Sequence, residues 1–83
     1  MFIAIQHEIT DPEQFWQKAS GALTHPPSGM RVHSTMLSQH EGLCQCMWEA
    51  ESIDSVREFL EPELGDSSVN TYYQIDPDLA IGY

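Results

Sequence analysis

The chain has 83 residues, with thirteen acidic side chains against three basic ones and a formal net charge of -10 at pH 7. A chain this short buries only about 60% of its unfolded surface, so we expect a single domain over residues 1–83 that gains from a partner subunit. The negative charge repels phosphate backbones and anionic lipid headgroups, which argues against nucleic acid and membrane partners. We expect a cytoplasmic protein, because no apolar run approaches the roughly 20 residues that cross a bilayer.

The first half of the sequence predicts a strand, a helix and a second strand. Residues 1–9 are rich in strand-forming types, apolar over residues 2–5 and polar over residues 6–8, which predicts a central strand with one end in water. Asp11 and Pro12 then provide an N-cap and a proline at the first helical position, for a helix that runs to about Leu23. The segment 25–29 contains Pro26 and Pro27 and cannot continue that helix.

The second half predicts a hairpin, a helix and a last strand. Residues 30–37 and 43–50 flank a short connection at residues 40–42. Ser52 can cap a second helix, whose apolar stripe runs to Leu60 and which ends near Pro62 and Gly65. Residues 69–76 alternate as a strand that Pro77 closes. The order βαββαβ predicts an α+β fold of the ferredoxin-like class, an antiparallel sheet with both helices on one face.

The hairpin has two candidate faces if the chain reverses at Glu41, because opposite residues then have numbers that sum to 82. The mostly apolar set is expected beneath the helices: Val32 opposite Ala50, Ser34 opposite Trp48, and Met36 opposite Cys46. The mixed set is expected on the uncovered face: His33 opposite Glu49, Thr35 opposite Met47, and Leu37 opposite Gln45. A slip of one residue would exchange the two faces.

The outer strands are expected to add hydrogen-bonding groups to the uncovered face. The more polar register of the first strand holds Gln6, and that of the last strand holds Asn70 and Tyr72. A sheet-on-sheet homodimer would enclose these groups together with His33 and Glu49. His7 falls on the register expected beneath the helices, although it is near the strand end and could reach the mouth of such a cavity.

This pattern resembles the small dimeric α/β-barrel superfamily, whose members pair two ferredoxin-like sheets around a central cavity. More closely, residues 31–34, 46–50 and 52–60 resemble a group of short uncharacterised proteins that includes a nickel-responsive metal-binding protein. That resemblance implies a homodimer and a divalent metal such as nickel or zinc. Other branches of the superfamily resemble cofactor-independent monooxygenases and muconolactone-type isomerases.

His33 and Glu49 admit three interpretations. They are a metal ligand with a carboxylate beside it, an imidazole base oriented by a carboxylate, or a hydrogen-bonded pair in a dimer interface. As metal ligands we consider His33, Glu49 and His7. Cys44 and Cys46 point the same way on a strand, and we favour core packing for them over chelation of a soft metal.

The leading hypothesis is a homodimeric ligand-binding protein whose cavity holds a divalent metal or a small organic molecule. The expected lining is His33, Glu49, Tyr72, Asn70 and Gln6. One alternative is a cofactor-independent isomerase or monooxygenase, in which His33 moves a proton and Tyr72 or Asn70 stabilises an oxyanion. Another is an interaction module without a ligand.

Overall fold

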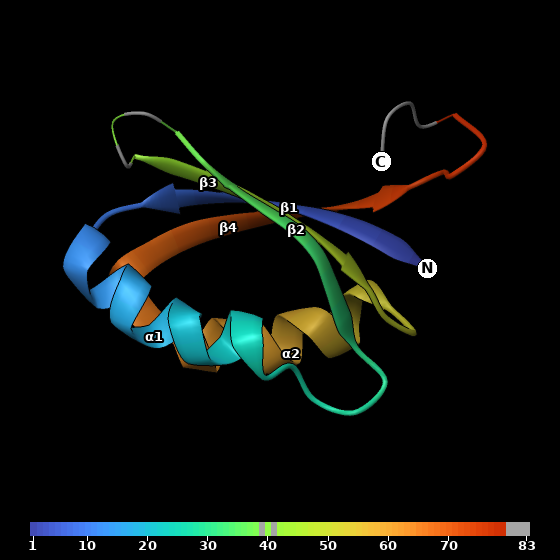
Figure 1. The fold of residues 1–83 in the computed structure, drawn as a ribbon, viewed down its shortest axis with the longest axis horizontal. Helices are drawn as coiled ribbons and strands as arrows, with labels where there is room; N and C mark the ends of the chain where they lie inside the picture. Colours follow the sequence, from blue (N-terminus) through green and yellow to red (C-terminus); the bar gives the residue numbers. More distant parts are fainter. Residues whose placement is uncertain (39, 41, 80–83) are drawn as a thin grey trace.

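The protein is described by a computed structural model, which covers residues 1–38, 40 and 42–79. Four strands form one sheet in the order β2-β3-β1-β4, and each neighbouring pair is antiparallel. Both helices lie on one face of this sheet (Figure 1). The order along the chain is β1 (Phe2–Ile9), α1 (Pro12–Thr24), β2 (Arg31–Leu37), β3 (Leu43–Glu49), α2 (Ile53–Leu64) and β4 (Ser68–Ile75). This confirms the predicted ferredoxin-like α+β fold.

Both helices begin at the predicted caps. The Asp11 side chain accepts a hydrogen bond from the Gln14 backbone at 3.1 Å, and Ser52 accepts one from the Ser55 backbone at 3.1 Å. Each bond satisfies an amide that the first turn of a helix leaves unpaired. Helix α2 continues past Pro62 to Leu64, because that last turn buries the Leu64 side chain against the core.

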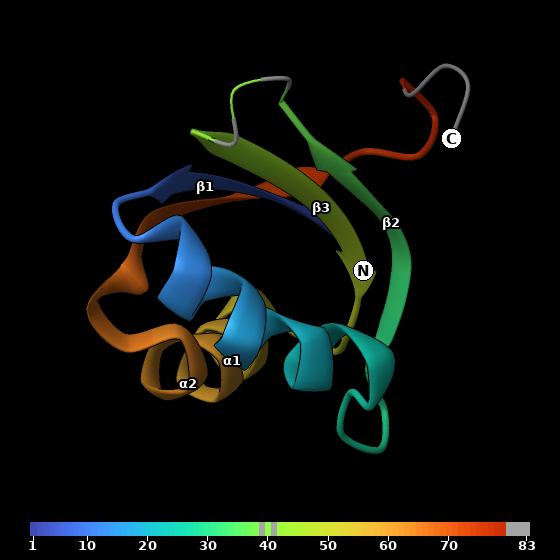
Figure 2. The ribbon, with the colours of Figure 1, turned by 60° about the vertical axis from the view of Figure 1, so that its left-hand side comes forward.

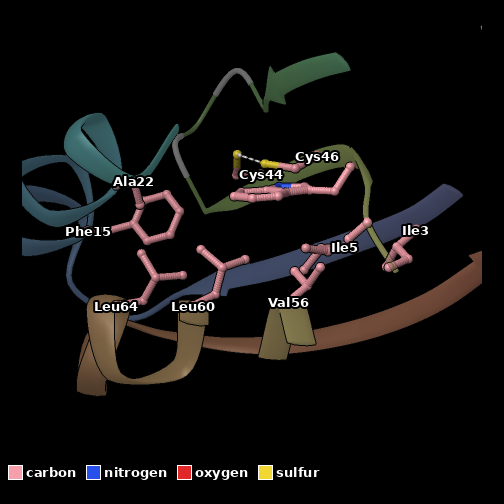
Figure 3. Packing of buried hydrophobic residues seen from close by; sticks show 12 residues of the cluster. Ile3, Ile5, Phe15, Ala22, Cys44, Cys46, Val56, Leu60 and Leu64 are labelled. Atoms are coloured by element: carbon pink, nitrogen blue, oxygen red, sulfur yellow. Dashed lines mark hydrogen bonds between the residues drawn. The ribbon is translucent and has the colours of Figure 1, made fainter. Parts of the chain in front are cut away.

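The hydrophobic core fills the layer between the sheet and the helices (Figure 3). Side chains from β1 and β3 meet side chains from α1 and α2, among them Ile5, Trp48, Phe15 and Leu60, all at most 1% exposed. Cys44 and Cys46 belong to this core, which confirms that the cysteine pair is buried.

The register of β2 against β3 contains an irregularity that the sequence did not predict. The observed partners are Arg31 with Glu49, Val32 with Trp48, Ser34 with Met47, and Thr35 with Cys46. The predicted register, with numbers summing to 82, is therefore wrong. Its reversal point, Glu41, lies outside the described residues.

The irregularity is a β-bulge, in which two residues of one strand oppose one residue of the other. Val32 and Thr35 both pair with buried residues of β3. The two residues between them, His33 and Ser34, therefore both face away from the helices. Beyond the bulge the faces of β2 are exchanged relative to the prediction: Ser34 and Met36 face away from the helices, and Thr35 and Leu37 face toward them.

The face assigned to β4 was also wrong. His7 and Ile5 are buried beneath the helices, and their partners on β4 are Asn70 and Tyr72. Directly opposite residues of an antiparallel pair share a face. Asn70 and Tyr72 therefore lie on the helix side, and Thr71 and Tyr73 lie on the other side.

We call the sheet surface without helices the open face; Figure 2 shows it uncovered above the strands. It is defined by Phe2, Ala4, Gln6, Glu8, Arg31, His33, Ser34, Met36, Leu43, Gln45, Met47, Glu49, Val69, Thr71, Tyr73 and Ile75. Four large apolar side chains of this face are exposed: Met36 by 59%, Leu43 by 45%, Val69 by 58% and Tyr73 by 52%.

Neither described helix has the length and apolar character that a membrane span requires.

Candidate functional site

One end of the open face carries the predicted His33 and Glu49 pair. The His33 Nε2 and Glu49 Oε1 atoms are 2.9 Å apart, and the His33 ring lies 5.4 Å from the ring of Phe2. Arg31, not His33, is opposite Glu49 in the ladder, so the imidazole reaches this carboxylate along a diagonal of the open face. The pair is partly exposed, and a shallow pocket of about 380 Å³ adjoins it at Arg31 and Glu49.

The electrostatics of this pair favour an ionised carboxylate. The hydrogen bond from His33 is the main influence that lowers the pKa of Glu49, and the charges of His33, Arg31 and the chain terminus lower it further. Such a pair can orient an imidazole base or supply two ligands to a metal.

The other end of the open face carries a second pocket, with a volume of about 330 Å³. The amide side chains of Gln6 and Gln45 belong to opposite residues of β1 and β3, and Met36 and Leu43 add apolar side chains beside them. Most of the exposed lining is apolar. This second pocket is shallow as well, but it combines apolar side chains with a few polar groups, as small-molecule sites do, and its volume falls within their usual range.

The predicted site residues are thus divided among three places. His33 and Glu49 lie together, and Gln6 lies on the same face in the other pocket. Asn70, Tyr72 and His7 lie on the helix side of the sheet. The arrangement in which Tyr72 or Asn70 stabilises an oxyanion beside His33 is therefore not found, and His7 does not join His33 and Glu49.

A chain of hydrogen bonds that the sequence did not predict lies beneath the helices. His7 Nδ1 is 2.6 Å from Asn70 Oδ1, and Asn70 Nδ2 donates to Glu61 Oε2 at 2.6 Å. Ser68 also donates to Asn70 Oδ1, at 2.8 Å. These hydrogen bonds connect the fully buried imidazole of His7 on β1 to the exposed carboxylate of Glu61 on α2. The available sequence signal was a polar residue, His7, in the inward register of the central strand.

The thiols of Cys44 and Cys46 lie next to this network of hydrogen bonds. Cys44 Sγ and Cys46 Sγ are 4.0 Å apart, and Cys46 Sγ is 3.8 Å from the hydroxyl of Thr35. A hydrogen bond with Cys44 is the main influence that lowers the pKa of Cys46, and it outweighs burial with help from His7 and Thr35. The same hydrogen bond raises the pKa of Cys44. Cys46 is therefore the thiol that ionises first.

The pKa of His7 reflects opposing influences. Burial is the largest and lowers it, but hydrogen bonds to Cys46 and Asn70 and the charges of Cys46 and Glu61 together raise it above the ordinary value. The imidazole of His7 is therefore more basic than that of an ordinary histidine, because these groups favour its protonated form.

Tyr72 differs from His7 because its hydroxyl has no partner. The ring lies under the Arg57 guanidinium, 4.9 Å from the ring centroid, while the hydroxyl oxygen is buried without a hydrogen bond to any described residue. Burial, and then the charge of Glu61, raises the pKa of Tyr72 to about 12. The hydroxyl therefore stays protonated at neutral pH.

The fold and these sites define a small α+β protein of the ferredoxin-like class with one uncovered sheet face. No protein family, curated protein or solved structure matches the chain. Within the part of the chain that the structure describes, no three His, Cys, Asp or Glu side chains are grouped to hold a metal.

Proposed function

We propose that two copies of the chain pack open face against open face, and that the homodimer binds a small, largely apolar organic molecule between the two sheets. The pocket formed by Gln6, Gln45, Met36 and Leu43 is the observation that carries this proposal. Its amides would orient polar groups of the ligand, and its apolar side chains would cover the remainder.

Charge distribution supports a second copy as the partner of the open face. Among the residues that define this face, Glu8 and Glu49 contribute two negative charges and Arg31 one positive charge, a net of -1 out of -10 for the chain. The remaining acidic groups lie elsewhere, so two copies can approach face to face with little direct repulsion. The exposed Met36 and Tyr73 supply apolar area that packing would remove from water.

The dimer is tested by comparing two variants that add the same charge. Tyr73→Glu places a carboxylate on the open face, and Gln17→Glu places one on an exposed position of α1. We expect native mass spectrometry and sedimentation to give a dimer for the natural chain and for Gln17→Glu, and a folded monomer for Tyr73→Glu. A monomeric natural chain, or a dimer that Tyr73→Glu leaves intact, would refute the packing of open face on open face.

The pocket is tested with the neutral fluorescent dye Nile red as a probe. Leu43→Trp fills the pocket while keeping it apolar, and Leu79→Trp makes the same change at a side chain that is 80% exposed after β4. We expect at least a tenfold weaker dye affinity for Leu43→Trp and no change for Leu79→Trp, with both variants dimeric. A dimer that binds no dye would instead favour an interaction module without a ligand.

A divalent metal such as nickel or zinc is the second candidate ligand, and the contact between His33 and Glu49 favours it. Among the described residues, one protomer offers these two ligands at that place, so a complete set would need the same pair from the second copy. We expect a bound metal mass in native spectra after addition of nickel or zinc, lost in His33→Ala and kept in the control His25→Ala. Equal loss in both variants, or no bound metal at all, would exclude this candidate.

A further inference from the structure

We propose that Cys46 is a peroxide-reactive thiol, that His7 supplies the proton to the leaving oxygen, and that Cys44 resolves the product into a reversible disulfide. The proposal concerns the helix side of the sheet and does not depend on the dimer or on a ligand at the open face. It rests on the placement of two thiols, an imidazole and an oriented amide in one buried cluster.

The two thiols are placed for reaction with each other. They occupy alternate residues of β3, so both point toward the helices, and their sulfur atoms are 4.0 Å apart (Figure 3). Both residues are only 1% exposed. Cys46 is nevertheless in contact with Thr35, an exposed residue of the edge strand β2, so its sulfur lies close to an edge of the sheet.

The hydrogen-bond chain determines which nitrogen of His7 faces the thiol. The Glu61 carboxylate is an acceptor, so Asn70 must direct its amide nitrogen to Glu61 and its oxygen to His7. That oxygen requires a proton on His7 Nδ1. Nε2 is then the nitrogen left for the thiols of β3, since His7 lies opposite Cys44 in the ladder and the pKa of His7 responds to Cys46. In the neutral imidazole, Nε2 is a base that can take the Cys46 proton.

The groups around Cys46 favour its thiolate. His7 comes from β1, Cys44 from β3 itself and Thr35 from β2, and Glu61 of α2 acts on His7 through Asn70. The side chains that α1 buries over the sheet, Phe15, Ala19 and Ala22, carry no charge. A thiolate, not a thiol, is the nucleophile in cysteine oxidation.

The first step is attack of the Cys46 thiolate on one oxygen of hydrogen peroxide. An S–O bond forms, the O–O bond breaks, and the departing hydroxide takes a proton from the His7 imidazolium and leaves as water. Cys46 becomes a sulfenic acid, so its sulfur loses two electrons and the peroxide gains them.

The second step is attack by Cys44 on the Cys46 sulfur. The Cys44 thiol gives its proton to His7, an S–S bond forms, the S–O bond breaks, and the leaving hydroxide recovers the proton as water. Overall, two thiols and one peroxide give a disulfide and two water molecules. Closing the sulfur separation from 4.0 Å to about 2.05 Å must distort β3. Such a strained disulfide is easily reduced, which makes the change reversible by a small thiol.

The experiment treats the full chain with hydrogen peroxide and follows the products by intact mass and peptide mapping. We expect the natural chain to lose two hydrogen masses and to regain them with dithiothreitol. Cys44→Ala should stop at a sulfenic acid that dimedone labels, and Cys46→Ala should leave Cys44 unlabelled. Dimedone labelling of Cys44 in place of Cys46 would overturn the assignment.

The pH profile separates a prepared site from an ordinary thiol and needs only the natural chain. A thiol with the usual pKa reacts more than about 50-fold faster at pH 8 than at pH 6, because its thiolate fraction rises by that factor. We expect the folded chain to react at a nearly constant rate over this range, and the urea-unfolded chain and His7→Gln to show the steep rise. A folded chain with the steep profile of the unfolded chain would show that oxidation occurs only through unfolding, and would overturn the proposal.

Discussion

Two polar side chains on the helix side of the sheet, His7 and Tyr72, differ in whether they have hydrogen-bond partners. His7 is fully buried, yet Asn70 connects it to the exposed Glu61, so its charge is balanced through an amide. The hydroxyl of Tyr72 on the neighbouring part of the same face has no such connection among the described residues. The hydrogen bonds of His7 therefore stabilise the fold, whereas burial of the unpaired Tyr72 hydroxyl destabilises it.

Replacing Tyr72 with Phe removes a buried hydroxyl that lacks a partner and keeps the ring under Arg57. We expect the free energy of unfolding to rise by about 1 kcal/mol, because the desolvation cost of the hydroxyl disappears. Urea denaturation measures this change in the free energy of unfolding. Tyr73→Phe is the matched control, since Tyr73 is 52% exposed and should change stability little. A loss of stability in Tyr72→Phe would mean that the hydroxyl has a partner after all.

Replacing Asn70 with Ala removes the hydrogen bonds that link His7 to Glu61. We expect the free energy of unfolding to fall by about 1–3 kcal/mol. The cost should depend on pH. A raised histidine pKa stabilises the fold fully below the unfolded value, about 6.5, and this contribution is lost as the pH rises through the folded pKa. Asn70 is one cause of the raised pKa, so denaturation should show a larger cost at about pH 5.5 than at about pH 9. Thr71→Ala, at the next residue on the open face, should show no such difference.

At the scale of elements, local signals specify where each helix and strand lies but not which residues face each other. The caps at Asp11 and Ser52 and the turn residues delimit the elements because they act through neighbouring backbone groups. The bulge at His33 and Ser34 involves no glycine and no other local signal, and it depends on how β2 fits against β3. The face of β4 was missed for a related reason. Asn70 looks like a surface residue until its partners His7 and Glu61 are known.

Two glycines should respond oppositely to replacement by Ala. Gly65 ends α2 with φ +57° and ψ -133°, a conformation that residues with a Cβ rarely adopt, so Gly65→Ala should cost about 1–3 kcal/mol. Gly21 lies in α1, where a Cβ would meet no atom within 4 Å. Gly21→Ala should therefore raise the free energy of unfolding by about 0.5–1 kcal/mol, since alanine loses less backbone entropy than glycine when the helix forms. Thermal unfolding of both variants checks the contrast, and similar shifts would contradict it.

At the scale of the whole molecule, the net negative charge opposes the dimer that the apolar open face favours. Each copy carries -10, so a dimer brings together a formal charge of -20. The proposed interface itself contributes little of that charge, and the repulsion comes from the acidic groups around it. Repulsion of this kind is screened by salt over distances of about 8–10 Å at physiological ionic strength.

The dimer should therefore become stronger as salt is added. We expect the dissociation constant to fall when the ionic strength rises from about 10 mM to about 200 mM, because screening weakens the repulsion between the two copies. Sedimentation equilibrium at several salt concentrations measures it. A dissociation constant that rises with salt would show that ion pairs, not apolar contacts, hold the copies together.

The two edges of the sheet are protected differently from joining another sheet. The edge strand β2 carries a bulge and Arg31, features that interrupt pairing with a foreign strand. The other edge, β4, runs for eight residues without a proline, a lysine or an irregularity in its pairing with β1, and it exposes Val69 and Tyr73. At neutral pH the net charge of -10 opposes contact between its free backbone groups and another copy of the chain. Near the isoelectric point, about 4.4, that repulsion vanishes, and β4 is where aggregation of this protein should begin.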